Sequence, residues 1–271
     1  MKRRSFLRKL TFSLLATTFP SLSWGGKKVK KEQSMNMVLH KNKSRGVADH
    51  GWLKSHHTFS FASYYNPDRM GFGTLRVIND DVVEPSMGFG THPHNNMEII
   101  SIPLKGSLKH KDTMGNEHVI AKGEVQAMSA GTGLQHSEYN NSSKESVNFL
   151  QIWVKPKKQN IKPNYSQKKF DEKDRLDQFQ LVVSPDGQKG SVEINQDAFF
   201  SLVSTNPNKE LVYSKYSKDN GVYFFVLDGE LDVGSEPLFK RDGLGIVNKD
   251  EIKILAKTYS ELLIMEVPLE V

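Results

Sequence analysis

A long series of short apolar runs, separated by Gly, Asn, Asp or Pro, limits this chain to a small set of folds. The runs are rich in β-branched and aromatic residues and have the length of β-strands, and turn residues such as Met114-Gly115-Asn116 separate them. Many short strands at close spacing predict an all-β fold built from barrels. Residues 164–177 are the exception, since they fit either a short helix or a linker. The clearest strand-length runs are residues 75–78, 97–102, 118–120, 125–128 and 147–154.

A faint internal repeat indicates two barrels. Residues 99–109 and residues 222–232 each contain an apolar strand, a turn that closes on Gly, and a Leu two residues later. No histidine follows His136, so the second copy has none. We therefore expect the second barrel to keep the architecture without the metal chemistry of the first.

Two short segments combine residues that bind metals. His92 and His94 form one pair, and His136 and Glu138 form another. On a β-strand, residues i and i+2 point to the same face with their Cα atoms about 6.6 Å apart, so each pair can direct two ligands at one ion. Two such pairs facing each other inside a barrel would make a set of three histidines and one carboxylate, with positions open for substrate or water. The chain has no cysteine, so a metal must bind nitrogen and oxygen, which suits iron, nickel, copper, manganese or zinc.

These segments resemble the two cupin motifs. Gly88–Gly106, with His92, His94 and Glu98, looks like the first motif, and Gly123–Asn140, with His136, looks like the second, although Ser129 replaces the usual proline and the loop before His136 is longer. Over most of residues 37–271 the chain more specifically resembles the pirin family. The matching stretches are residues 50–52, 56–61, 90–94, 131–133, 136–138, 181–187 and 194–198.

The resemblance implies an all-β bicupin of two tandem cupin barrels, each a double-stranded β-helix or jelly roll. Residues 37–155 would form the metal-binding barrel, residues 156–180 a linker, and residues 181–271 a second barrel without metal ligands. The resemblance also implies one divalent transition metal. Fe²⁺ is the first candidate, with Ni, Cu, Mn, Co and Zn as alternatives. The implied ligands are His92, His94, His136 and Glu138.

Glu98 is the rival carboxylate, because many other cupins take their glutamate ligand from the first motif. It is expected either to bind the metal or to orient one of the imidazoles. His56 and His57 are adjacent and must face opposite sides of a strand, which favours structural hydrogen bonding. His110 and His118 flank the turn at residues 114–116 and are expected to be exposed.

The resemblance implies a metal-dependent dioxygenase that opens a flavonol such as quercetin, with a small planar aromatic substrate and dioxygen. Glu138 or Glu98 would accept the proton of the substrate hydroxyl. The alternative is an exported metal-binding or redox-sensing protein that acts through a protein partner. A metal-free scaffold is disfavoured because all four ligand positions are occupied. We expect a monomer.

The N-terminus has the layout of an export signal. Arg3-Arg4 is followed by Ser5-Phe6-Leu7 and by the apolar run of residues 11–24, and residues 1–26 closely resemble a twin-arginine signal peptide. The run is too short to span a bilayer comfortably, so we expect signal cleavage, no remaining membrane span, and a periplasmic protein. Removing the five cations of this segment leaves 32 basic against 31 acidic side chains, which argues against a nucleic-acid partner.

Overall fold

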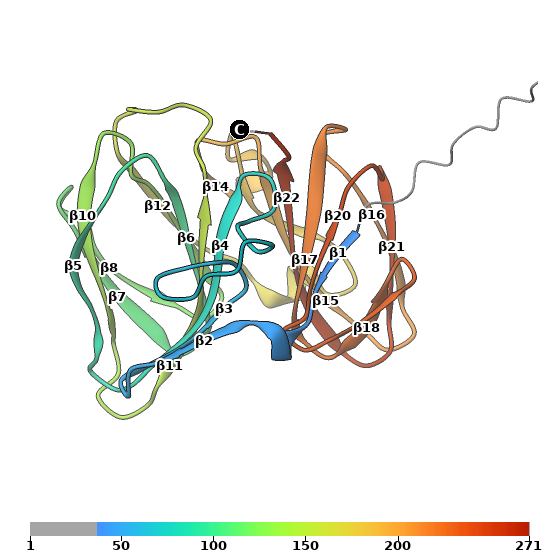
Figure 1. Ribbon diagram of the computed structural model, residues 1–271, viewed down its shortest axis with the longest axis horizontal. Helices are drawn as coiled ribbons and strands as arrows, with labels where there is room; N and C mark the ends of the chain where they lie inside the picture. The colour runs from blue at the N-terminus through green and yellow to red at the C-terminus, as the bar shows by residue number, and fades with distance from the viewer. Residues whose placement is uncertain (1–36, 271) are drawn as a thin grey trace, which may run out of the picture. The chain divides into compact units, whose positions relative to one another are not determined.

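The computed structural model describes residues 37–270, which form two β-barrels side by side (Figure 1). Each barrel consists of one seven-stranded and one four-stranded sheet. The described helical segments are three short 3₁₀ turns, η1 (Asn42–Ser44), η2 (Glu172–Arg175) and η3 (Gln188–Gly190). None of the helices in this part of the chain has the length and apolar character needed to cross a bilayer.

The first barrel contains both predicted metal-binding segments in its smaller sheet. In hydrogen-bonding order the smaller sheet comprises β5 (Gly88–His94), β10 (Leu134–Asn140), β7 (Ser107–Asp112) and β8 (Glu117–Ala121). The larger sheet comprises β12 (Asn164–Lys169), β9 (Glu124–Ser129), β6 (Glu98–Lys105), β11 (Val147–Val154), β4 (Leu75–Val83), β3 (Leu53–His57) and β2 (Gly46–Asp49).

The second barrel has the same two-sheet plan. Its larger sheet comprises β1 (Met37–His40), β20 (Gly243–Ile246), β17 (Asn220–Asp228), β22 (Ser260–Pro268), β15 (Phe199–Thr205), β13 (Gln180–Ser184) and β14 (Val192–Glu193). Its smaller sheet comprises β16 (Glu210–Ser214), β21 (Glu251–Ala256), β18 (Glu230–Val233) and β19 (Glu236–Phe239).

The internal repeat is confirmed by the strand order. In the first copy the chain leaves the larger sheet on β6, turns at Gly106 and enters the smaller sheet on β7. The second copy leaves the larger sheet on β17, turns at Gly229 and enters the smaller sheet on β18. The all-β prediction and the prediction of two barrels are therefore both correct.

The two larger sheets pack against each other through a shared apolar core. Ile100 of β6 and Ile152 of β11 belong to the same buried cluster as Phe225 of β17 and Leu263 of β22. Because one face of these strands meets the other barrel and the opposite face lines their own barrel, the strands are buried on both faces. Their sequences therefore read as continuous apolar runs rather than strict alternations.

The two barrel interiors differ in chemistry. The second is filled by apolar side chains, among them Phe224, Leu231 and Ile254. The first has separate apolar clusters around Phe149 and around Met128. Strand alternation places a layer of polar side chains between them, because Ser101 and Gln151 lie two residues from members of these clusters on their strands. The first barrel therefore places polar side chains in the middle of its interior.

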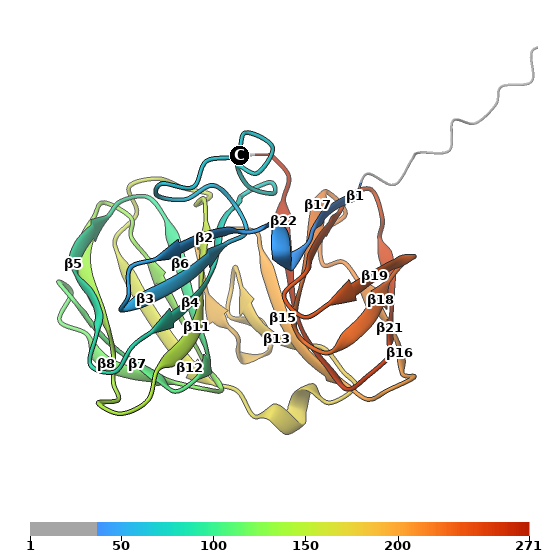
Figure 2. The ribbon, with the colours of Figure 1, turned by 60° about the horizontal axis from the view of Figure 1, so that its bottom comes forward.

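Two strands belong to sheets that the sequence did not suggest. β1 lies within the segment expected to form the first barrel, yet it pairs with β20 of the second (Figure 1). Figure 2 shows β1 against the strands of the second barrel. Residues 164–169 were interpreted as a helix or part of a linker, but they form β12, which pairs with β9 along its whole length. Tyr165 lies opposite Met128 of β9, and Lys169 lies opposite Glu124. Backbone pairing with a strand that is distant in the sequence therefore determines the structure of this segment.

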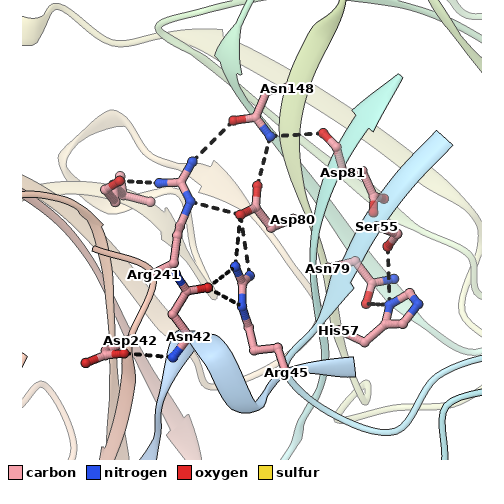
Figure 3. Close-up of polar contacts among 11 residues, drawn as sticks. Asn42, Arg45, Ser55, His57, Asn79, Asp80, Asp81, Asn148, Arg241 and Asp242 are labelled. Atoms are coloured by element: carbon pink, nitrogen blue, oxygen red, sulfur yellow. Dashed lines mark hydrogen bonds and ion pairs between the residues drawn. The ribbon is translucent and has the colours of Figure 1, made fainter. Parts of the chain in front are cut away.

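A buried ionic network joins the barrels (Figure 3). Asp80 of β4 accepts hydrogen bonds from Arg241 Nε at 2.9 Å and from both terminal nitrogens of Arg45 at 3.4 Å. Its second oxygen accepts the Asn148 amide at 2.8 Å. Burial would raise the pKa of Asp80, but Arg241, Asn148 and Arg45 together bring it below its usual value. The carboxylate is therefore charged and holds cations from two different parts of the chain.

Candidate metal centre

The two predicted ligand pairs lie on neighbouring strands. β5 and β10 pair antiparallel, and His136 lies directly opposite His92. The register shifts between His136 and Glu138, so Glu138 lies opposite Phe89 on one side and opposite His110 of β7 on the other. Residues His92 and His94 share a face of β5 because they are two positions apart. Local alternation and strand pairing together bring the ligand side chains to one end of the first barrel.

Three imidazoles converge there. The ring centroid of His136 lies 4.4 Å from that of His92 and 4.9 Å from that of His94, and the centroids of His92 and His94 are 4.9 Å apart. Nitrogen atoms from the three rings lie within 4.8 Å of one another. The predicted three-histidine set is thus assembled in space.

Burial keeps two of these imidazoles neutral. It lowers the pKa of His136 to about 2, with further lowering by His92, His94 and His110. It lowers the pKa of His94 to about 4, with a smaller contribution from His92. A metal binds the neutral imidazole, so these rings are in the state that coordination requires.

The hydrogen bonding of His92 and His136 leaves ring nitrogens available for a metal. Both ring nitrogens of His136 are buried and have no hydrogen-bond partner among residues 37–270, although buried polar atoms are nearly always paired. Nδ1 of His92 lies 2.8 Å from the carbonyl oxygen of Gly90. A carbonyl can only accept, so Nδ1 carries the hydrogen and Nε2 keeps the lone pair that a metal needs.

Glu138 is the buried carboxylate of the cluster. The Ser101 hydroxyl lies 3.1 Å from one of its oxygens, and the Gln151 amide donates to the other at 2.8 Å. Burial raises the pKa of Glu138 to about 7, although these two hydrogen bonds act in the opposite direction. Its carboxyl group also lies within 4.8 Å of donor nitrogens of His110 and His136, so it belongs to the same interior.

The prediction for His110 is wrong. Its side chain is fully buried, and its ring centroid lies 5.3 Å from that of His136. On β7 the buried Leu108, His110 and Asp112 alternate with exposed Lys109 and Lys111. That alternation is present in the sequence and could have placed His110 in the interior. His118, its partner on β8, is exposed as expected.

Glu98 does not belong to the cluster. It is buried at the start of β6, where one oxygen accepts the Ser129 hydroxyl at 2.5 Å and the Asn195 backbone N–H at 3.0 Å. Burial raises its pKa. The expected role of Glu98 in orienting an imidazole is therefore wrong. Its position at the strand start directs it to Asn195, which lies between β14 and β15 of the second barrel.

His94 packs against an aromatic side chain and also lines an open pocket. Trp153 packs edge-on against His94 with 5.0 Å between ring centroids, and Phe61 packs edge-on against Trp153 at 5.3 Å. An open pocket of about 540 Å³ reaches His94 from outside, a size in the range of small-molecule sites. Its lining residues are Pro93, His94, Asn95, Thr113, Thr132, Gly133, Leu134 and Gln135. Farther along the barrel wall, His57 is hydrogen bonded to Asn79 at 2.8 Å, which confirms its structural role.

Two tandem barrels, with histidines and a carboxylate gathered inside one of them, define a bicupin. Sequence comparison agrees with this class. The family model described as pirin matches residues 39–154, and the model described as the quercetinase C-terminal cupin domain matches residues 181–267. The chain is 44% identical over 232 residues to quercetin 2,3-dioxygenase of Escherichia coli (strain K12), covering 86% of this chain and 99% of that protein. The chain belongs to the pirin family.

Solved structures show the same relationship. The crystal structure of YhhW from Escherichia coli has 43% sequence identity and a TM-score of 0.83, and the match covers 87% of this chain and 99% of that one. YhhW in complex with nickel(II) has 42% identity and a TM-score of 0.82, covering 87% and 100%. The bicupin fold is thus shared with a protein that has been crystallised with a divalent metal.

Proposed function

We propose that this protein is a metal-dependent dioxygenase that opens flavonols such as quercetin. One divalent transition metal would be held by His92, His94, His136 and Glu138. The observation that carries the proposal is that donor nitrogens of His92, His94 and His136 lie within 4.8 Å of one another, with the Glu138 carboxyl group equally close to His136, in a chain 44% identical to a protein named quercetin 2,3-dioxygenase. Two unpartnered nitrogens on His136 support a metal in this position.

The residues around the cluster would have different roles in the reaction. When bound, the metal would supply a Lewis-acidic position that polarises an oxygen of the substrate. Glu138 would accept the proton of the substrate hydroxyl on a carboxylate oxygen, and Ser101 and Gln151 hold that carboxylate in place. The wall of Trp153 and Phe61 offers flat apolar surface for a planar substrate. The pocket beside His94 would be the entrance.

The identity of the metal is part of the proposal. Fe²⁺ is the first candidate, and nickel is supported by the YhhW complex with nickel(II). Imidazole and carboxylate donors also suit Cu, Mn, Co and Zn. Metal analysis of protein purified without added metal would decide among them.

The test combines that analysis with oxygen uptake in the presence of quercetin. We expect about one metal per chain and quercetin-dependent uptake, both lost in His92→Ala and both kept in the exposed control His118→Ala. Bound metal without oxygen uptake would overturn the assignment of a flavonol substrate, but the metal site would stand. A protein that binds no metal would overturn the proposal as a whole. If Glu138→Gln kept its metal and its full turnover, Glu138 would not be the proton acceptor.

The proposal also includes export and a monomeric state. Residues 1–26 lie outside the described residues, and the twin-arginine resemblance is the reason to expect a periplasmic protein. Fractionation should find a shortened chain in the periplasm, and replacing Arg3-Arg4 by Lys-Lys should leave the full-length chain in the cytoplasm. Light scattering of the exported protein should give the mass of one chain.

A further inference from the structure

We propose that His110 is a further metal donor, which with His136 and Glu138 forms an inner position for the divalent ion. The outer position is the one of the proposed function, where His92, His94, His136 and Glu138 would hold the ion. The inference rests on the proposed function in one respect, that the first barrel binds a divalent metal. Because both positions use His136 and Glu138, they are alternative places for one ion.

The donor atoms of the inner position are close enough to share one ion. Those of His110, His136 and Glu138 lie within 4.8 Å of one another, as do those of His92, His94 and His136. Two donors that each lie about 2.1 Å from a common ion are roughly 3–4 Å apart, so a small closure of the side chains suffices. All three residues of the inner set are buried, whereas His92 and His94 are partly exposed.

A hydrogen bond to Asp112 sets the tautomer of the His110 ring. Its Nε2 lies 3.1 Å from an oxygen of Asp112. That carboxylate also accepts the backbone N–H groups of Met114 and Asn116 and the side-chain amide of Asn116, at 2.8 to 3.0 Å. A carboxylate held by three donors acts as an acceptor toward the ring, so Nε2 carries the hydrogen and Nδ1 keeps a lone pair.

The lone pair on Nδ1 of His110 has no partner among the described residues. Nδ1 of His110 is buried and makes no hydrogen bond within residues 37–270. A histidine whose second nitrogen donates to a carboxylate is the usual arrangement of a metal ligand. His92 shows the equivalent arrangement with the carbonyl oxygen of Gly90. The turn at residues 114–116 thus acts through Asp112 to prepare His110 as a donor.

The two unpartnered nitrogens of His136 are consistent with two alternative metal positions. A single metal bond would use only one of these two nitrogens. Because His136 belongs to both groups of donors, its ring can bind the ion in the inner or in the outer position. The alternative is that His110 only supports the fold, with a water on Nδ1. In that case His110 would not change metal binding in a protein that lacks the outer set.

The test measures the binding of Ni²⁺ alone by titration calorimetry. The double variant His92→Ala/His94→Ala should still bind one Ni²⁺, more weakly than the unaltered protein. Adding His110→Gln should weaken binding further by at least about tenfold, since even the loss of an outer-shell partner costs about 10–100-fold. Adding His118→Gln instead is the matched control, because His118 pairs with His110 across the strands and also packs on Tyr165. The added His118→Gln substitution should leave the affinity for Ni²⁺ unchanged.

A second measurement avoids removing the outer set. In the otherwise intact protein, Asp112→Asn should alter the visible absorption spectrum of bound Co²⁺ and lower its affinity by about 10–100-fold. Thermal unfolding in the presence of a chelator would establish that each variant is folded. An unchanged Co²⁺ spectrum in a folded Asp112→Asn protein would overturn the inference.

The outcomes separate this inference from the proposed function. If the double variant binds no Ni²⁺ while the unaltered protein does, or if adding His110→Gln makes no difference, the inner position is wrong and the metal centre stands. If the unaltered protein binds no metal, the proposed function and the inference both fail.

Discussion

Gln151 donates a hydrogen bond to Glu138 across the interior of the first barrel, with 2.8 Å between Nε2 and Oε2. Gln151 lies on β11 in the larger sheet and Glu138 on β10 in the smaller one, so the bond joins opposite walls. The Ser101 hydroxyl lies 3.1 Å from an oxygen of each residue. The position of the carboxylate is therefore set by the sheet that packs against the second barrel.

Replacing Gln151 by Leu should weaken divalent metal binding by about 10–100-fold, the usual effect of removing a partner of a metal ligand. The variant keeps the volume of the side chain but removes the donor to Glu138. Titration calorimetry with Ni²⁺ would measure the change, and Gln178→Leu at an exposed position is the control. Equal affinities for Gln151→Leu and the control would show that the hydrogen bond does not position the carboxylate.

Replacing Asp80 by Asn should lower the free energy of unfolding by about 3–5 kcal/mol, the range expected when one partner of a buried ion pair is removed. The change leaves Arg45 and Arg241 close together without their shared counter-charge (Figure 3). Urea unfolding would measure it. Glu210→Gln, which breaks an exposed pair with Lys253, should change stability by less than about 1 kcal/mol. A similar small effect for Asp80→Asn would mean that the network does not stabilise the protein.

Replacing Gly131 by Ala should destabilise the protein more than replacing Gly115. Both glycines have positive φ, +47° and +93°, which costs an Ala roughly 1 kcal/mol or more. At Gly131 the added methyl group would also overlap the carbonyl oxygen of Ile161, while at Gly115 no atom lies within 4 Å. Thermal unfolding of the two variants gives the comparison. Equal melting temperatures would show that the loop at Ile161 moves freely out of the way.

The unfolding free energy should fall between pH 6.5 and pH 4 partly because of His40. Burial, with a smaller contribution from Arg69, lowers the pKa of His40 from 6.5 to about 4. The unfolded chain therefore takes up a proton in this window before the folded chain does, which favours unfolding as the pH falls, by at most about 3 kcal/mol. In His40→Gln the decrease should be smaller, and in the exposed control His50→Gln it should be unchanged. Parallel pH profiles for all three proteins would contradict this assignment.

The candidate metal ligands could be predicted because each pair is a local pattern. His92 and His94, and likewise His136 and Glu138, are two positions apart on strands, and this spacing alone puts each pair on one face. The alternation on β7 could have placed His110 in the interior, but it does not show which residues His110 meets there. Its link to Glu138 depends on the pairing of β7 with β10, which joins residues far apart in the chain.

Alternating and continuous apolar runs in the sequence determined that the chain would form strands, and the repeat around Gly106 and Gly229 determined that it would form two barrels. Both are properties of neighbouring residues. The tertiary structure alone decided that β1 joins the second barrel, that β12 extends the first, and that Glu98 bonds to Asn195 rather than to an imidazole. The reason is physical: a strand edge or a buried carboxyl group is satisfied by whichever donor the fold brings to it, and sequence distance does not limit that choice.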